Sequence, residues 1–142
     1  MLTEMKQLVK EKNLCVLATM AGNKPYCSLM AYAANDEGTE LYLATLRSSK
    51  KFCNLEENPA VSLLIDTRED DPPSRARALT VEGTCAVIAD DSKRQFARAR
   101  LLSIHPHLQD FLARTDSELL CVRMEAFLLL KGLTEAHRAT VE

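Results

Sequence analysis

The chain has 142 residues, of which 20 are acidic and 18 basic, and its formal net charge is −2. This balance excludes the basic footprint of a general nucleic-acid binder, and the longest wholly apolar run, Leu29 to Ala34, is far shorter than the roughly 20 residues of a membrane helix. The first residues, MLTEMKQLVKEK, carry too many charges for a signal-peptide core, so we expect one domain over residues 1–142, in the cytoplasm, with neither nucleic acid nor membrane as a partner.

The first third of the chain is predicted to form one helix and a meander of three strands. The helix is amphipathic and covers residues 2–12, where apolar residues recur at helical spacing. Three apolar runs of strand length follow: LCVLATM (14–20), PYCSLMAYAA (25–34) and ELYLAT (40–45). Turn residues separate them, AGNK (21–24) and NDEG (35–38), which favours antiparallel hairpins.

Two longer helices are predicted in the remaining chain, each with a capping residue at its start. The first is SSKKFCNLEEN (48–58), capped by Ser48 or Ser49, and the second is DSKRQFARARLLSIH (91–105), capped by Asp90 or Asp91. His105-Pro106 interrupts the second helix, and residues 107–115 are expected to add another helical turn.

Three further strands are predicted between and after these helices: AVSLLID (60–66), ALTVEGTCAVIAD (78–90) and ELLCVRMEAFLLLKG (118–132). Gly83 inside the second of these strands indicates a bulge or a sharp bend. The tail after residue 132 has no strong pattern. Antiparallel hairpins with segregated helices predict a barrel or an α+β fold rather than a doubly wound parallel sheet.

One local feature suggests chemistry on physical grounds, the segment TLRSSKK (45–51), which runs from a strand end into a helix start. Free N–H groups and the helix dipole favour an anion at a helix N-terminus. Hydroxyl groups and three cations, those of Arg47, Lys50 and Lys51, accompany that helix start. The alternative is a solvated basic face capped by serine. The spacing is not that of a P-loop.

The segments PYCSLMAYAANDEGTELYLATLRSSKKFCNLEENPAVSLLID (25–66) and ALTVEGTCAVI (78–88) resemble the FMN-binding split β-barrel family that includes pyridoxamine 5′-phosphate oxidase. The resemblance is clearest over residues 10–90. It implies a mainly β (α+β) fold, a six-stranded antiparallel split β-barrel with flanking short helices. It also implies a homodimer that holds FMN in the groove between its two subunits.

The resemblance also implies which residues hold the cofactor. The residues matching the phosphate and ribityl part of the family's site are Ala44, Thr45, Ser49, Lys50 and Lys51. The residues matching the strand whose backbone faces the flavin ring are Ser28, Leu29 and Met30. Two cations, a hydroxyl group and a helix N-terminus stabilise a bound phosphate dianion. For the phosphate-binding residues, the physical interpretation therefore agrees with the resemblance.

The sequence departs from true pyridoxamine-phosphate oxidases in the substrate half of the site. The C-terminal part, FLLLKGLTEAHR (127–138), has neither a Trp nor an Arg-x-His pair, and Ala78 stands near the position of a flavin-contacting Gln. We therefore expect an FMN-dependent oxidoreductase that does not oxidise vitamin B6 phosphates. Its substrate would be an unknown small molecule, with a reduced nicotinamide as a possible electron donor, and no catalytic residue is assigned.

A second interpretation is a non-catalytic protein that binds flavin or haem for sensing, storage or haem utilisation. Some split-barrel relatives bind haem through a histidine near the C-terminus, which points to His137, with His105 and His107 as other candidates. A deazaflavin is a third cofactor option, because relatives of this barrel also use it. The absorption spectrum of the purified protein discriminates between flavin and haem.

Five cysteines are spread over the chain, in no metal-binding spacing: Cys15, Cys27, Cys53, Cys85 and Cys121. An odd number without a signal sequence predicts reduced thiols that serve as small packing residues. No metal site is expected, because the three histidines lie away from any cysteine cluster. Cys27, beside the predicted flavin strand, is the thiol to test for reactivity.

Overall fold

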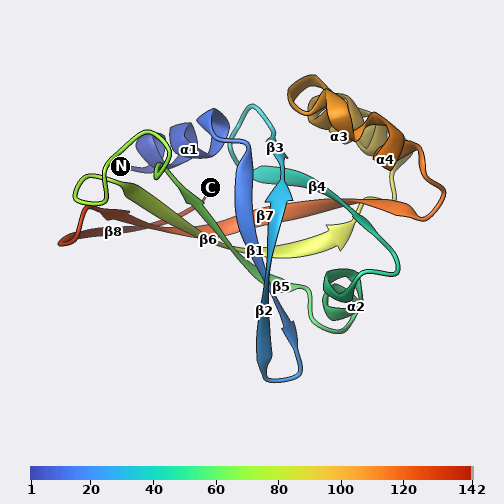
Figure 1. Cartoon of the computed structure of the whole chain (residues 1–142), viewed down its shortest axis with the longest axis horizontal. Helices are drawn as coiled ribbons and strands as arrows, with labels where there is room; N and C mark the ends of the chain where they lie inside the picture. Colours follow the sequence, from blue (N-terminus) through green and yellow to red (C-terminus); the bar gives the residue numbers. More distant parts are fainter. Residues whose placement is uncertain (142) are drawn as a thin grey trace.

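The computed structural model describes residues 1–141. Its main element is one curved antiparallel sheet (Figure 1) in which neighbouring strands follow the order β2-β1-β5-β6-β7-β4-β3, with β8 paired to β7. The strands are β1 (Leu14–Ala21), β2 (Lys24–Ala31), β3 (Ala33–Ala34), β4 (Glu40–Leu46), β5 (Ala60–Asp66), β6 (Arg77–Val87), β7 (Ser117–Lys131) and β8 (Glu135–Thr140). The predicted mainly β, α+β fold is confirmed.

Short helices flank the sheet, as predicted. They are α1 (Leu2–Glu11), α2 (Lys50–Glu57), α3 (Asp91–Ile104) and α4 (Gln109–Ala113), with the short 3₁₀ helix η1 (Pro106–Leu108) before the last of them. In Figure 1, α1 lies over one end of the curved sheet, and α3 and α4 lie together at the other end. None of the helices in residues 1–141 is long and apolar enough to cross a membrane.

The predicted number of six strands is wrong, because the sheet has eight. The predicted strand 25–34 breaks at Tyr32, whose N–H bonds to Asn13 O (2.9 Å) and whose hydroxyl donates to Val9 O (2.6 Å). Before this residue the chain pairs with β1, and after it the chain pairs with β4. Tyr32 therefore marks the point at which one continuous run changes its partner in the sheet.

The tail after residue 132, for which the sequence predicts no element, forms the second of the two extra strands, β8. β8 pairs with β7 from Lys131↔Glu135 to Ala126↔Thr140, and the turn between them uses Gly132 at φ +60°, a conformation that glycine adopts without steric cost. β8 has no buried residue in its span, so it shows no apolar alternation from which a strand could be inferred.

The expected irregularity at Gly83 is present. The register between β6 and β7 shifts at Glu82/Gly83, as at a β-bulge. A Cβ atom on Gly83 would lie 2.5 Å from Arg123 O, so the residue is glycine because the neighbouring strand is too close for a side chain. β6 ends at Val87 rather than residue 90, because Asp90 instead caps α3 through a bond from Lys93 N (2.8 Å).

The core lies on the inner face of the curved sheet. Alternate residues of adjacent strands point inward and are fully buried, among them Leu17, Leu63, Leu79 and Leu129, while their neighbours point outward. α1 closes this core with Met5, Leu8 and Val9. On α3 the buried residues are Ala97 and Leu101, whereas Phe96 is 45% exposed.

The prediction that the cysteines are mostly buried packing residues holds for three of the five. Cys27 and Cys53 are exposed in the single chain. Burial raises the pKa of the Cys15 and Cys85 thiols to about 12 and that of Cys121 to about 11, which suppresses their reactive thiolate forms.

We expect N-ethylmaleimide to leave Cys15, Cys85 and Cys121 unmodified in the native protein and to label all five thiols after unfolding. The physical reason is that burial both blocks access to these three thiols and keeps them protonated. Peptide mass spectrometry identifies the labelled residues. Rapid labelling of Cys15 or Cys85 in the folded protein would contradict the packing described here.

Candidate functional site

A cavity of about 320 Å³ opens between β2, β4, the start of α2 and the η1–α4 segment. Three kinds of residue line it. The strand β2 contributes apolar atoms, β4 and the start of α2 contribute hydroxyl groups and one cation, and η1 and α4 contribute two apolar side chains. The lining residues are Leu29, Met30, Ala31, Ala44, Thr45, Leu46, Ser48, Ser49, Lys51, Leu108 and Phe111. We refer to this as the main cavity.

The hydroxyl groups of the main cavity are fixed by the start of α2. Ser49 is the N-cap of that helix and accepts a bond from Phe52 N (3.2 Å). Its Oγ also lies 2.9 Å from Oγ1 of Thr45, which is only 1% exposed. If Thr45 donates in this pair, Ser49 accepts two bonds and keeps its own O–H for a ligand. In that arrangement the pair presents one hydroxyl donor to the cavity.

The amide groups at the start of α2 add further donors. The cap satisfies Phe52 N, and Cys53 N bonds to Ser49 O (3.2 Å), which leaves the amides of Lys50 and Lys51 without a partner inside the helix. Asn54, 2% exposed, holds the helix against β1 through a bond to Thr19 Oγ1 (3.1 Å). The helix start thus presents, beside the cavity, free N–H groups of the kind that favour an anion.

The three cations of the TLRSSKK segment have different environments. Lys51 is half-buried and lines the main cavity. Lys50 is exposed, and its ammonium lies 5.3 Å from the centre of the Tyr26 ring, a cation–π geometry. Arg47 bonds to Glu118 Oε1 (2.7 Å) and Thr115 O (2.6 Å), so Glu118 compensates its charge. Only Lys51 offers its charge to the cavity.

The structure brings together six of the eight residues that the sequence predicts for cofactor binding. Those lining the main cavity are Leu29, Met30, Ala44, Thr45, Ser49 and Lys51. Ser28 and Lys50 do not line it. Ser28 lies one residue along β2, opposite Leu17, and Lys50 precedes Lys51 by one residue, which rotates its side chain by about 100° around the helix.

Leu108 and Phe111 are lining residues that the sequence reasoning missed. Both come from the segment after the His105-Pro106 interruption, for which the sequence predicts only a helical turn. They reach the cavity because α3 and α4 fold back beside the end of β4. The sequence contains no signal for this, since the contact joins residues more than 60 positions apart.

The segment that carries Phe111 is anchored to its surroundings. The carbonyl oxygen of Leu112 accepts bonds from Arg98 Nη1 (2.9 Å) and Ser117 Oγ (3.3 Å), and the Leu112 side chain is buried. Ser117 in turn pairs with Leu46 at the end of β4. These contacts hold Phe111, which is half-buried, at the edge of the main cavity.

A partly buried ion pair joins α3 to the sheet. Lys93 Nζ donates to Glu40 Oε2 (2.9 Å), and the Tyr42 hydroxyl donates to Glu40 Oε1 (3.1 Å). Burial by itself raises the pKa of Glu40, but the bonds from Lys93 and Tyr42 outweigh this effect and the net pKa is lowered. Glu40 is therefore ionised at neutral pH and joins α3 to β4.

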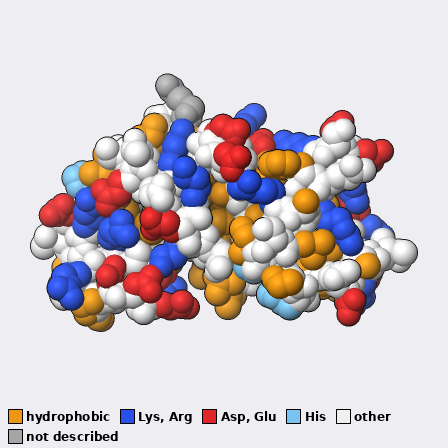
Figure 2. Space-filling model, turned by 90° about the horizontal axis from the view of Figure 1, so that it is seen from above, with side chains coloured by type: hydrophobic (Ala, Val, Ile, Leu, Met, Phe, Trp, Pro, Cys, Tyr) orange, Lys and Arg blue, Asp and Glu red, His pale blue; other side chains and the backbone are white. Residues whose placement is uncertain are grey.

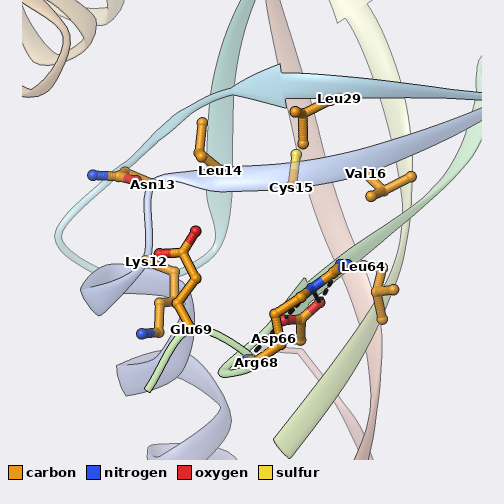
Figure 3. A pocket seen from close by; sticks show the side chains of 10 residues that line it. All are labelled: Lys12, Asn13, Leu14, Cys15, Val16, Leu29, Leu64, Asp66, Arg68 and Glu69. Atoms are coloured by element: carbon orange, nitrogen blue, oxygen red, sulfur yellow. Dashed lines mark hydrogen bonds and ion pairs between the residues drawn. The ribbon is translucent and has the colours of Figure 1, made fainter. Parts of the chain in front are cut away.

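A second hollow, of about 290 Å³, lies on the outer face of the sheet (Figure 3). Its apolar wall includes Val16, Leu29 and Leu64, and Leu29 also lines the main cavity. Two ion pairs lie at its rim, Asp66 with Arg68 (2.6 Å) and Lys12 with Asp70, and Glu69 also lines it. This hollow therefore combines an apolar wall with a charged rim.

The histidines lie elsewhere. His105 is buried and its Nε2 lies 3.0 Å from Tyr32 O. His137 is on β8, with its Nε2 3.4 Å from Glu135 Oε2. No histidine lines the main cavity, and no group of three metal-ligating side chains occurs in residues 1–141.

Charged side chains of both signs are interspersed on the face seen in Figure 2, and hydrophobic side chains gather toward its middle. This distribution agrees with the near-zero net charge. That face shows no continuous basic field of the kind that binds nucleic acid.

A family model described as pyridoxamine 5′-phosphate oxidase matches residues 1–130. No curated protein is matched by sequence. A heme binding protein from Mycobacterium smegmatis has the same fold, with TM-score 0.84 at 21% identity, over 96% of this chain and 56% of that protein. This chain thus spans little more than half the length of that relative.

Two further structures match along most of their length. A FAD-binding protein from Mesorhizobium loti has TM-score 0.74 at 18% identity, over 89% of this chain and 91% of that one. General Stress Protein 26 from Bacillus anthracis has TM-score 0.70 at 24% identity, over 97% and 98% of the two chains. At these identities the similarity establishes a shared fold.

Proposed function

Because the chain belongs to the pyridoxamine 5′-phosphate oxidase family, we propose that it is an FMN-binding flavoprotein that transfers hydride or electrons to or from a small molecule. The observation that carries this proposal is the main cavity. It joins a capped helix start, an oriented hydroxyl pair and Lys51 to the apolar strand β2. This donor set fits a phosphate at one side of the cavity and a flat ring along the other.

The residues divide the work of binding. Lys51, Ser49 and the amides at the start of α2 hold the phosphate, and Thr45 orients Ser49. Leu29 and Met30 place apolar atoms under the ring, and the backbone of β2 from Ser28 to Met30 offers N–H and C=O groups to its polar edge. The flavin supplies the redox chemistry, and the protein supplies binding, orientation and exclusion of water.

The proposal includes a homodimer with the cofactor between the subunits. Outward-facing residues of five adjacent strands stand in register across the sheet: Leu29, Val16, Leu64, Thr80 and Leu128. On this face Leu29 is 73% exposed, and Leu14 and Leu130 are 45% and 41% exposed. Exposed apolar surface of this kind marks an interaction site, and a second copy related by a two-fold axis would cover it.

We place the substrate outside the vitamin B6 phosphates. Residues 127–138 contain no Arg-x-His pair, and the Ala78 side chain has no group that could form a hydrogen bond to a flavin. With no acid or base assigned near the ring, a reduced nicotinamide serves as the electron donor and a small molecule as the acceptor. The phosphate half of the site carries the proposal.

Haem is the second candidate ligand, because a structural relative is named a heme binding protein. An axial histidine would have to come from outside the residues that line the main cavity, since His105 is bonded to Tyr32 O and His137 lies on β8. The donor set at α2 suits a phosphate better than a porphyrin carboxylate pair, so flavin stands first.

Titration of the purified protein with FMN tests the function. We expect binding of one FMN per chain, a yellow protein with a flavin absorption spectrum, and bleaching of that spectrum by a reduced nicotinamide. Mass spectrometry of the released ligand separates FMN from a deazaflavin. A red protein with a Soret band would replace flavin by haem, and a protein that takes up neither ligand would contradict both.

A further inference from the structure

The main cavity has one wall to which neither the sequence reasoning nor the proposed function assigns a role. It is formed by Leu108 of η1 and Phe111 of α4. Among the described residues that line the cavity, Phe111 is the only aromatic one. The polar donors come from β4 and α2, so this wall is apolar and separate from them.

The packing of α4 against its neighbours orients the Phe111 side chain toward the main cavity. α4 buries Leu112, the next residue, and directs its carbonyl to Arg98 and Ser117. Successive helical side chains diverge by about 100°, so anchoring Leu112 turns Phe111 away from the protein interior. The ring remains half-buried and makes no aromatic contact among residues 1–141, whereas Phe96 on α3 packs on Tyr42 at 5.9 Å.

A half-exposed aromatic ring beside a cation, hydroxyls and free amides suggests a ligand with two different ends. The polar donors can form hydrogen bonds to an anion, and the Phe111 ring and Leu108 can pack against a flat apolar surface. Stacked aromatic pairs gain more than the burial of their area alone. The cavity thus has the two complementary surfaces that a phosphate-bearing aromatic cofactor needs.

Resting on the proposed function, we propose that Phe111 is a cofactor-contacting residue: its ring packs on the flavin ring system from the side opposite β2, with Leu108 beside it. β2 supplies one wall and the η1–α4 segment another, so each chain contributes a strand and a short helix to the site between the subunits. The η1–α4 segment therefore sets how wide a ring system the cavity accepts.

The first test compares Phe111→Leu with Phe96→Leu in FMN titrations of the full chain. Leucine keeps apolar volume but removes the ring, so Phe111→Leu is expected to raise the dissociation constant roughly threefold to tenfold. Phe96→Leu is the matched control, because Phe96 lies on the neighbouring helix, is partly exposed and does not line the cavity. It is expected to leave FMN binding unchanged.

The second test uses the absence of tryptophan from this chain. Phe111→Trp places a single indole in the cavity wall, and its emission is expected to be almost fully quenched when one FMN binds. Phe96→Trp is the control, in which the indole lies away from the cavity, and the quenching of its emission by FMN is expected to be weaker. Thermal unfolding of each variant confirms that the half-exposed position leaves the fold intact.

The outcomes separate the two proposals. Weaker binding by Phe111→Leu alone, with contact quenching in Phe111→Trp alone, supports the role of Phe111. If wild-type protein binds FMN but both Phe111 variants behave like their Phe96 controls, the role of Phe111 is overturned while the flavin site stands. If wild-type protein binds no FMN, both proposals are overturned.

Discussion

Replacing Lys51 by alanine is expected to weaken FMN binding by roughly tenfold to a hundredfold, while replacing Lys50 by alanine leaves it nearly unchanged. Hydrogen bonds to charged groups contribute about 1.5–3 kcal/mol, and every 1.4 kcal/mol is about a tenfold change in affinity. Lys51 lines the main cavity, whereas the Lys50 ammonium lies over the Tyr26 ring outside it. Fluorescence titration with FMN measures the difference.

The adjacent lysines form their own matched pair, since both substitutions remove one positive charge from the same helix start. A general electrostatic effect of the basic segment would therefore weaken binding equally in both variants. Equal losses would show that charge alone attracts the cofactor, and an unchanged affinity in Lys51→Ala would remove Lys51 from the site. The loss in Lys51→Ala is also expected to shrink at high salt, because screening weakens the contribution of its charge.

In the proposed dimer, replacing Leu64 by glutamate is expected to leave a monomer of 15.8 kDa and to abolish FMN retention. Leu64 lies in the middle of the outward-facing row, between Val16 and Thr80. In a two-fold dimer both copies of the new glutamate would lie unpaired in the interface. Burying them would cost several kcal/mol of association free energy. Light scattering after size-exclusion chromatography measures the mass, and the flavin absorbance measures retention.

Leu133→Glu is the control for the dimer test, because Leu133 is 88% exposed beyond the end of β7 and outside the sheet. It is expected to remain dimeric. Leu14→Glu, on the outer face and 45% exposed, is a second variant in which the added charge is solvated in the monomer, so folding is preserved. A wild-type monomer, or a dimer that persists in Leu64→Glu and Leu14→Glu, would contradict the proposed interface.

The sequence predicted local structure correctly where residues close together in the chain determine that structure. The hairpin between β1 and β2, the cap of α2 at Ser49 and the interruption at His105-Pro106 depend on residues within one or two turns of chain. Gly83 was also readable, because glycine inside an apolar strand needs a special reason. The structure identifies that reason as the close approach of Arg123 O.

Two features were not readable, because strand pairing or a single tertiary contact decides them rather than a local apolar pattern. β8 lacks an apolar pattern of its own and forms because β7, the strand just before it, offers a free edge. Tyr32 looks like the interior of a strand, yet its bonds to Asn13 O and Val9 O divide that strand in two. The Tyr32 bonds reach residues about 20 positions earlier, so the sequence around Tyr32 does not reveal them.

The amino-acid sequence by itself determined the class of this protein, an antiparallel fold with flanking helices. It also predicted a helix start suited to an anion and, through a resemblance, eight residues of a cofactor site. These features follow from short-range patterns and from motif spacing. Only the tertiary structure decided that Lys51, and not Lys50 or Arg47, faces the main cavity, and that Phe111 closes it from the other side. Which charge is free and which ring is exposed depends on Tyr26, Glu118 and Leu112, and those contacts arise only when distant segments pack together.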